Sequence, residues 1–287
     1  MARPTDMGDD KVAETPTSGR AGRNLFAAIG VGLFLGVGLV LIPVLYAPAL
    51  FSVIVSIAMV ISVLELRGAV AHRGISLVAV PAALGAAAMP QAAYWLGAVP
   101  MLAVFAVTVV VILGYRLING VEGYLADVSA SIFAVAYTGL MASFVSLMMT
   151  SSHGAQRVIT VIVLTVASDI GGYAAGVLAG RHPMAPGISP KKSWEGFAGS
   201  LLLQSIVGIG LFIWLWHAPW WQGLLTGLIM TVTATAGDLI ESAIKRDLGV
   251  KDMSHLLPGH GGLLDRLDSV LPNAFTGWLL LRTYIGP

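Results

Sequence analysis

Long apolar runs separated by short polar turns make up most of this sequence. A helix needs roughly 20 apolar residues to cross a bilayer, and somewhat shorter segments still span it. By this rule the pattern predicts an all-α integral membrane protein with about nine transmembrane helices, at residues 25–43, 48–64, 74–90, 95–114, 127–149, 157–179, 197–216, 221–244 and 267–285. Residues 1–24 are polar and lack a hydrophobic period, which predicts a disordered tail.

The distribution of positive charge predicts the orientation of these helices. If the N-terminus is cytoplasmic and the helices alternate, Arg157 and Arg282 are the two basic residues that fall outside. The other 14 of the 16 basic residues then lie on the cytoplasmic side, as the positive-inside rule requires: Arg3, Lys11, Arg20, Arg23, Arg67, Arg73, Arg116, Arg181, Lys191, Lys192, Lys245, Arg246, Lys251 and Arg266. Aromatic residues mark the outer turns: Tyr46, Tyr94, Trp95, Trp216, Trp220 and Trp221.

Composition supports the membrane assignment and excludes several functions. The chain is 56% hydrophobic and 11% charged, whereas soluble domains contain about 25% charged residues. The absence of cysteine excludes disulfides, thiolate catalysis and cysteine-based zinc sites. A net charge of +1 without a basic stripe gives no indication of nucleic-acid binding. Glycine pairs four residues apart favour close helix packing, within the chain or in a homodimer: Gly32/Gly36, Gly176/Gly180 and Gly223/Gly227.

One stretch, residues 237–268, differs from its apolar surroundings in its density of charge. Its six acidic residues are Asp238, Glu241, Asp247, Asp252, Asp265 and Asp268, and with them stand Lys245, Arg246, Lys251, Arg266, His255 and His260. Apolar runs flank the stretch on both sides, so we expect a charged segment held at the membrane surface. This is the predicted active site, and the chain accordingly divides into a tail (1–24), N-terminal helices (25–155) and a catalytic region (156–287).

The acidic residues of this stretch have the spacing of a cation site. Asp238 shares one helix face with Glu241, Ser242 and Lys245, because they follow at i+3, i+4 and i+7. Asp265 and Asp268 lie three residues apart where the last span begins. Carboxylates that converge from two helix ends repel one another, and Mg²⁺ with oxygen ligands relieves that repulsion. The alternative is a purely structural network of ion pairs.

A second polar cluster lies upstream. Asp169 falls within a predicted span and shares a helix face with four residues of the same segment, Gly172, Tyr173, Gly176 and Gly180. A carboxylate there faces a wet cavity or only hydrogen-bonds a neighbouring helix. Lys191 and Lys192 follow, beside hydroxyl groups, and are suited to hold phosphate groups. The alternative for the lysines is ordinary cytoplasmic charge beside a helix N-cap at Ser193.

Carboxylates for a metal and lysines for phosphates, all at a membrane surface, indicate phosphoryl or nucleotidyl transfer to a lipid. The sequence has no phosphate-binding P-loop, and it has no Gly-x-Ser-x-Gly elbow of a serine hydrolase.

The charged stretch also resembles the C-terminal motif of the phosphatidate cytidylyltransferase (CDP-diacylglycerol synthase) family. The likeness extends over 27 residues and reads Ser242-x-Ile244-Lys245-Arg246-x4-Lys251-Asp252-x-Ser254-x2-Leu257-Pro258-x-His260-Gly261-Gly262-Leu263-x-Asp265-Arg266-Leu267-Asp268. The upstream segments Ser168-Asp169-x-Gly171-Gly172-Tyr173 and Ile188-Ser189-Pro190-Lys191-Lys192-Ser193-x-Glu195-Gly196 are similar to a second region of that family, with Gly172 in place of its usual alanine. The resemblance covers residues 165–285.

The resemblance implies Mg²⁺-dependent transfer of CMP from CTP to phosphatidate, on the cytoplasmic side of the cell membrane, with room for a second cation. It implies metal binding by Asp238 and Asp265, and catalytic roles for Asp238, Ser242, Lys245, Asp265 and Asp268. The implied substrate-binding residues are Asp169, Lys191, Lys192, Arg246, Lys251, His260 and Arg266.

Two other functions are compatible with the pattern. A polyprenol or dolichol-type lipid kinase uses similar chemistry, but it moves a terminal phosphate rather than CMP. An ion transporter needs acidic residues at several depths of the membrane, whereas in this chain they gather at the predicted inner surface.

Overall fold

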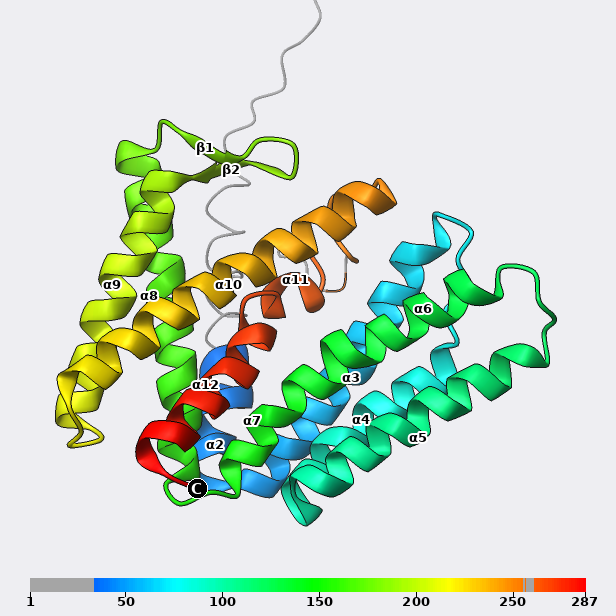
Figure 1. Ribbon diagram of the computed structural model, residues 1–287, viewed down its shortest axis with the longest axis horizontal. Helices are drawn as coiled ribbons and strands as arrows, with labels where there is room; N and C mark the ends of the chain where they lie inside the picture. Colours follow the sequence, from blue (N-terminus) through cyan, green and yellow to red (C-terminus); the bar gives the residue numbers. More distant parts are fainter. Residues whose placement is uncertain (1–33, 255, 257–260) are drawn as a thin grey trace, which may run out of the picture.

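The computed structural model describes residues 34–254, 256 and 261–287, and this part of the chain is mostly helical (Figure 1). In chain order its elements are the π-helix η1 (Phe34–Leu41), α2 (Ile42–Tyr46), α3 (Pro48–Ala71), α4 (Ala79–Leu96), α5 (Ala98–Leu117), α6 (Tyr124–Ala134), the π-helix η2 (Val135–Leu140), α7 (Met141–Met149), α8 (Gly154–Ala179), β1 (Pro183–Ala185), β2 (Ser189–Ser193), α9 (Trp194–Trp214), α10 (Trp220–Leu248), α11 (Leu264–Leu267) and α12 (Val270–Ile285). The predicted tail, 1–24, lies outside the described residues.

Within the described residues, six helical segments are long and apolar enough to cross a membrane. They are Pro48–Ala71, Ala98–Leu117, Tyr124–Met149, Gly154–Ala179, Trp194–Trp214 and Trp220–Leu248, and each overlaps one predicted span. The predicted span 74–90 corresponds to α4, which has 18 residues and contains Pro90, and 267–285 corresponds to α12, which has 16 residues. Only the end of the first predicted span is described, in η1 and α2. Nine spans therefore remain a prediction.

The helices form two groups that α12 joins. Figure 1 shows α8, α9 and α10 on one side and α3 to α7 on the other, with α12 between them. α12 contacts α7, α8 and α10. The buried apolar residues form two clusters, and Trp278 of α12 packs against both. Because α12 continues directly from the charged stretch, the position of that stretch depends on both groups of helices.

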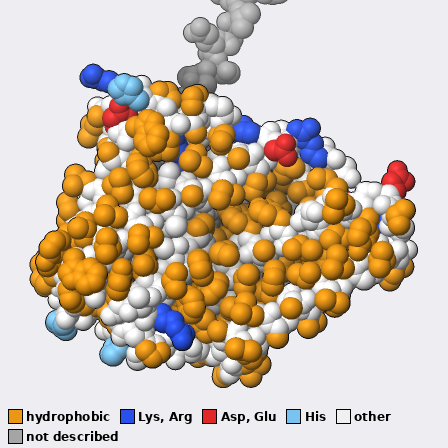
Figure 2. Space-filling view, viewed as in Figure 1, with side chains coloured by type: hydrophobic (Ala, Val, Ile, Leu, Met, Phe, Trp, Pro, Cys, Tyr) orange, Lys and Arg blue, Asp and Glu red, His pale blue; other side chains and the backbone are white. Residues whose placement is uncertain are grey.

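The surface indicates an integral membrane protein. Figure 2 shows apolar side chains over most of the visible face, with Lys, Arg, Asp and Glu side chains gathered mainly along the upper edge. Large apolar residues on several helices are well exposed, among them Leu84, Val110 and Leu202, each about two-thirds accessible. Soluble monomers rarely expose contiguous apolar patches above a few hundred Å², so this surface fits a lipid environment.

The stretch between α8 and α9 contains a small hairpin that the all-α prediction did not include. β1 and β2 pair antiparallel, with Pro183 opposite Ser193 and Ala185 opposite Ser189. The strands have three and five residues, too short for a hydrophobic period to reveal them. The predicted N-cap is confirmed, because the Ser193 Oγ accepts a hydrogen bond from the Gly196 amide at 3.1 Å. The hairpin thus holds both lysines directly before the first turn of α9.

Glycine permits the close contact between α9 and α10. A Cβ added to Gly223 of α10 would overlap the carbonyl oxygen of Gly208 in α9, and one added to Gly208 would overlap the carbonyl of Gly223. The predicted packing role of Gly223 is therefore confirmed, and the first turns of α10 are held against α9.

We expect Gly223→Ala to destabilise the protein by about 1–3 kcal/mol, because the added methyl group forces the two backbones apart. The matched control is Gly114→Ala in α5, where an added Cβ meets no atom within 4 Å. Thermal unfolding in detergent should show a lower Tm for Gly223→Ala and an unchanged or higher Tm for Gly114→Ala. Equal Tm values for the two variants would contradict this account of the contact.

Candidate active site

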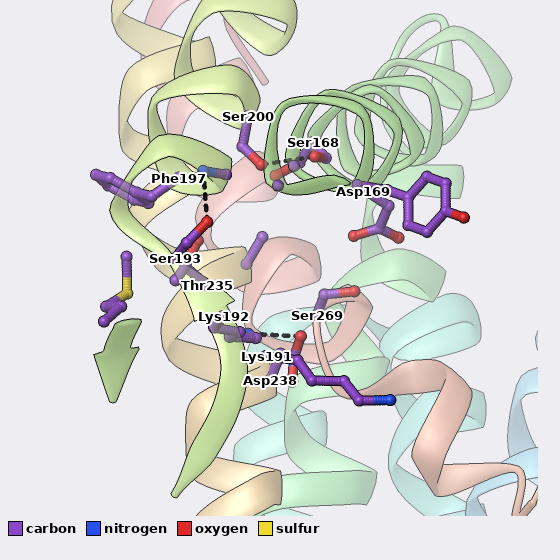
Figure 3. Close-up of a pocket in the computed structure, with 16 residues that line it drawn as sticks. Ser168, Asp169, Lys191, Lys192, Ser193, Phe197, Ser200, Thr235, Asp238 and Ser269 are labelled. Atoms are coloured by element: carbon purple, nitrogen blue, oxygen red, sulfur yellow. Dashed lines mark hydrogen bonds and ion pairs between the residues drawn. The ribbon is translucent and has the colours of Figure 1, made fainter. Parts of the chain in front are cut away.

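A cavity of about 320 Å³ lies between α8, α9, α10 and the β1–β2 hairpin (Figure 3). Four predicted substrate or metal residues line it: Asp169, Lys191, Lys192 and Asp238. Most of their neighbours in the lining are small or hydroxylated, including Ser168, Ser193, Ser200, Thr235 and Ser269, and Met184 and Phe197 are the large apolar ones. The structure therefore brings the upstream polar cluster and the start of the charged stretch to one place.

Lys192 and Asp238 form the ion pair at the centre of this cavity. The Lys192 Nζ lies 2.5 Å from Asp238 Oδ2. Figure 3 shows this pair on one side of the cavity and Asp169 on the other. Ser242 Oγ, one turn along α10, donates to Asp238 Oδ1 at 3.4 Å. The Asp238 side chain is still 40% exposed. Its carboxylate is held in place by these contacts and remains accessible to a ligand.

Three carboxylates act on one another around the cavity. Asp268 interacts electrostatically with Asp238 and Asp169, and Lys192 offsets part of that repulsion. Asp169 likewise interacts with Asp238 and Lys192. Ser269, the neighbour of Asp268, lines the cavity. Like charges this close favour a bound cation, because a cation relieves the repulsion that would otherwise oppose ionisation.

Lys245 and Asp265 form a second cluster, outside the cavity lining. The Lys245 Nζ lies 2.5 Å from Glu241 Oε2 and 2.9 Å from Asp265 Oδ1. Asp265 Oδ2 accepts hydrogen bonds from the amides of Gly262, at 2.7 Å, and Met253, at 3.0 Å. Burial acts to raise the pKa of the Asp265 carboxyl, but hydrogen bonds with Glu241, Lys245 and Gly262 lower that pKa to about 2. Both Asp265 oxygens are thus engaged by groups of the chain itself.

The remaining predicted residues are distributed around these two clusters. Arg246 Nε donates to the carbonyl of Ile188, which ties the end of α10 to the hairpin. Lys251 and Arg266 are exposed and are not part of the cavity lining, and His260 lies outside the described residues. Among the residues that the structure describes, no three His, Asp or Glu side chains form a ready-made metal cage. Mg²⁺ does not require one, since it is usually held by one or two carboxylates together with substrate phosphates.

Glu65 of α3 contacts the charged stretch in the folded protein, although the sequence analysis did not identify it. It lies in α3, is 7% exposed, and accepts hydrogen bonds from Ser254, Leu263 and Leu264. The predicted span ends at residue 64, so Glu65 counted as a loop residue there. The helix continues to Ala71, and a carboxylate inside an apolar helix is itself a functional signal.

Tyr137 is a second residue from the N-terminal helices that reaches the site. It lies in η2, in the middle of the membrane segment Tyr124–Met149, and π-helical turns often occur at functional sites. Its side chain is 8% exposed, and its hydroxyl has no hydrogen-bond partner in the described part of the chain. It interacts electrostatically with Asp268, Glu241 and Asp238. Tyr137 is not among the residues that line the cavity, so its unpaired hydroxyl is buried behind the site.

Similarity to known proteins extends over almost the whole chain. Residues 26–284 match the model of the Cytidylyltransferase family. The chain is 42% identical to a phosphatidate cytidylyltransferase of Mycobacterium bovis, over 96% of this chain and 97% of the relative. It is 42% identical to one of Mycobacterium leprae, over 93% and 90%, and 31% identical to one of Staphylococcus saprophyticus, over 87% and 94%. The similarity therefore includes the N-terminal helices, which contain none of the motif segments described above.

Proposed function

The chain belongs to the Cytidylyltransferase family, and we propose that it transfers CMP from CTP to phosphatidate, giving CDP-diacylglycerol and pyrophosphate. The observation that carries this proposal is the cavity in which two lysines, Lys191 and Lys192, meet the carboxylates Asp169 and Asp238. Lysines suit phosphate groups, and carboxylates suit the cation that accompanies a nucleotide. The name shared by the relatives supports the two substrates.

In the proposed reaction, a phosphate oxygen of phosphatidate attacks the α-phosphorus of CTP. A new P–O bond forms there, the bond from the α-phosphorus to the bridging oxygen breaks, and pyrophosphate leaves. Lys192 turns from Asp238 to a substrate phosphate, and Lys191 supplies a second positive charge. Lys245 and Ser242 hold the carboxylates in place, since these are the groups they contact. Arg246, Lys251, His260 and Arg266 are proposed to contact phosphates from the surrounding stretch.

The residues of the cavity fit a magnesium ion. Mg²⁺, when bound, neutralises the charge of the triphosphate and of the leaving pyrophosphate. Asp238 is the best-supported ligand, because its carboxylate is ordered by Ser242 and accessible. Asp265 is the predicted second ligand, but its contacts are those of a residue that positions the motif. We propose Asp268 as the partner ligand, because its backbone packs against Gly237, the neighbour of Asp238, and its own neighbour Ser269 lines the cavity. The three carboxylates also leave room for a second cation.

We propose the nine-span topology, with a cytoplasmic N-terminus and the active site on the cytoplasmic side of the cell membrane. The clustering of charge along one edge of the molecule supports this orientation (Figure 2).

We also propose a homodimer. Gly36 supports it, because an added Cβ at that position meets no atom within 4 Å among the described residues, so this position is open to a partner helix.

The proposed reaction is tested with purified protein, phosphatidate, Mg²⁺ and CTP labelled at the α-phosphorus. We expect the label to enter the lipid fraction, and EDTA to abolish the transfer. Label that enters the lipid only from the γ-position of a nucleotide would instead identify a lipid kinase. If folded protein transfers neither label, the proposed function is wrong.

The proposed metal ligands are tested by comparing Asp238→Asn, Asp268→Asn and Asp265→Asn in the same assay. Loss of a direct ligand should raise the Mg²⁺ concentration needed for half-maximal activity, whereas loss of a positioning residue should lower kcat at saturating Mg²⁺. We expect the first result for Asp238 and Asp268, with losses of at least about 10²-fold at low Mg²⁺, and the second for Asp265. The opposite pattern for Asp265 and Asp268 would assign the metal to Asp265, as the sequence motif implies.

The proposed topology is tested with single cysteines, since the chain contains none of its own. Tyr46 and Val121 are 80% and 84% exposed and lie in turns predicted on opposite sides of the membrane. A membrane-impermeant maleimide should label Tyr46→Cys in intact cells and Val121→Cys only after the cells are opened. Labelling of both in intact cells would show that one helix between them, such as the proline-containing α4, does not cross.

A further inference from the structure

Glu65 is the one acidic residue of α3, a helix that is otherwise mostly apolar. It follows the run Met59–Leu64 in α3 and is 7% exposed. A buried carboxylate is costly unless donors surround it. The groups that donate hydrogen bonds to Glu65 therefore indicate the role of this carboxylate.

Every hydrogen bond that the structure gives to the Glu65 side chain comes from the charged stretch. Oε1 accepts from Ser254 Oγ at 2.6 Å and from the Leu263 amide at 2.8 Å, and Oε2 accepts from the Leu264 amide at 2.8 Å. These partners lie 189 to 199 residues away in the chain. Within the described residues, Glu65 therefore connects an N-terminal helix to the catalytic motif and to no other element.

A second carboxylate holds the adjoining amide. Asp265 Oδ2 accepts from the Gly262 amide at 2.7 Å, so that two carboxylates together hold three consecutive amides, 262 to 264. A Cβ on Gly262 would lie 2.9 and 3.0 Å from the Glu65 oxygens and 3.0 Å from Asp265 Oδ2. Glycine at this position is what lets both carboxylates approach the same turn.

We propose that Glu65 is a positioning residue for the reaction: by holding the turn Gly262–Leu264 it sets the places of Asp265 and Asp268. The inference rests on the proposed active site, but its structural part can be measured without any activity. A carboxylate serves this role because both of its oxygens accept hydrogen bonds. In Glu65→Gln one of them becomes an NH₂ group, which meets an amide that also donates.

The experiment compares Glu65→Gln with Glu65→Asp, Ser254→Ala and the control Glu122→Gln. Asp keeps two acceptor oxygens on a shorter side chain. Ser254→Ala removes the hydroxyl that donates to Glu65 and accepts from the Leu256 amide. Glu122 is another carboxylate of the N-terminal helices, exposed in the turn before α6. Each change is also combined with Leu256→Cys, an exposed position (52%) whose amide donates to Ser254 Oγ. A spin label on this cysteine reports the mobility of the motif in an otherwise cysteine-free chain.

For Glu65→Gln we expect kcat to fall about 10–100-fold, as for loss of residues that orient metal ligands. The KM for CTP should change little, the Tm should stay within a few degrees of wild type, and the spin label should become more mobile. Glu65→Asp should recover part of kcat. Ser254→Ala should also mobilise the label with the fold intact, because it removes both the contact to Glu65 and the hydrogen bond of the Leu256 amide. Glu122→Gln should match wild type in all readouts.

Two results would overturn the proposal. One is wild-type kcat in Glu65→Gln, and the other is a lower kcat with wild-type mobility of the label. If the wild-type protein fails to transfer CMP, the proposed function fails, whereas the mobility comparison still decides whether Glu65 holds the turn.

Discussion

The turn at residues 262–264 is held by two carboxylates, Glu65 and Asp265, and the geometry of the charged stretch depends on it. Three consecutive amides donate to these side chains. If these buried amides had no acceptors, each would lower the stability of the folded protein by about 1–3 kcal/mol. Asp265 in turn holds Lys245 on α10. The contact therefore connects α3, the motif and α10, which explains why the N-terminal helices are needed beside a cavity lined by residues of the C-terminal half.

The sequence predicted most of the helices and little of what connects them. Long apolar runs such as those of α5, α8 and α10 are unambiguous, because only a helix satisfies its backbone inside a membrane. The end of α3 was placed too early, since Glu65 and Arg67 interrupt the apolar run although the helix continues past them. The β1–β2 hairpin has no periodic signal, because its strands are short and depend on the neighbouring α9 cap.

The candidate site could be predicted where residues lie close in sequence, and it could not where they meet only in space. The face that carries Asp238 and Ser242 follows from helical spacing, and the structure shows the contact between the two side chains. That Lys192 meets Asp238 depends on how the hairpin packs against α10, which no local pattern encodes. Tyr137 depends on a π-helical turn that shifts the register of its helix. Its sequence neighbours gave no reason to single it out.

The charges of the cavity explain why a lipid nucleotidyltransferase would place its site here. Three carboxylates, Asp169, Asp238 and Asp268, act on one another, while Lys192 is already paired with one of them. A triphosphate adds further negative charge, so the proposed Mg²⁺, held by Asp238, would supply the positive charge that carboxylates and phosphates lack. Lys191 and Lys192, which line the same cavity, would then hold the substrate phosphates. A cavity with these charges would bind a nucleotide better with a cation than without one, because three carboxylates and a triphosphate repel one another.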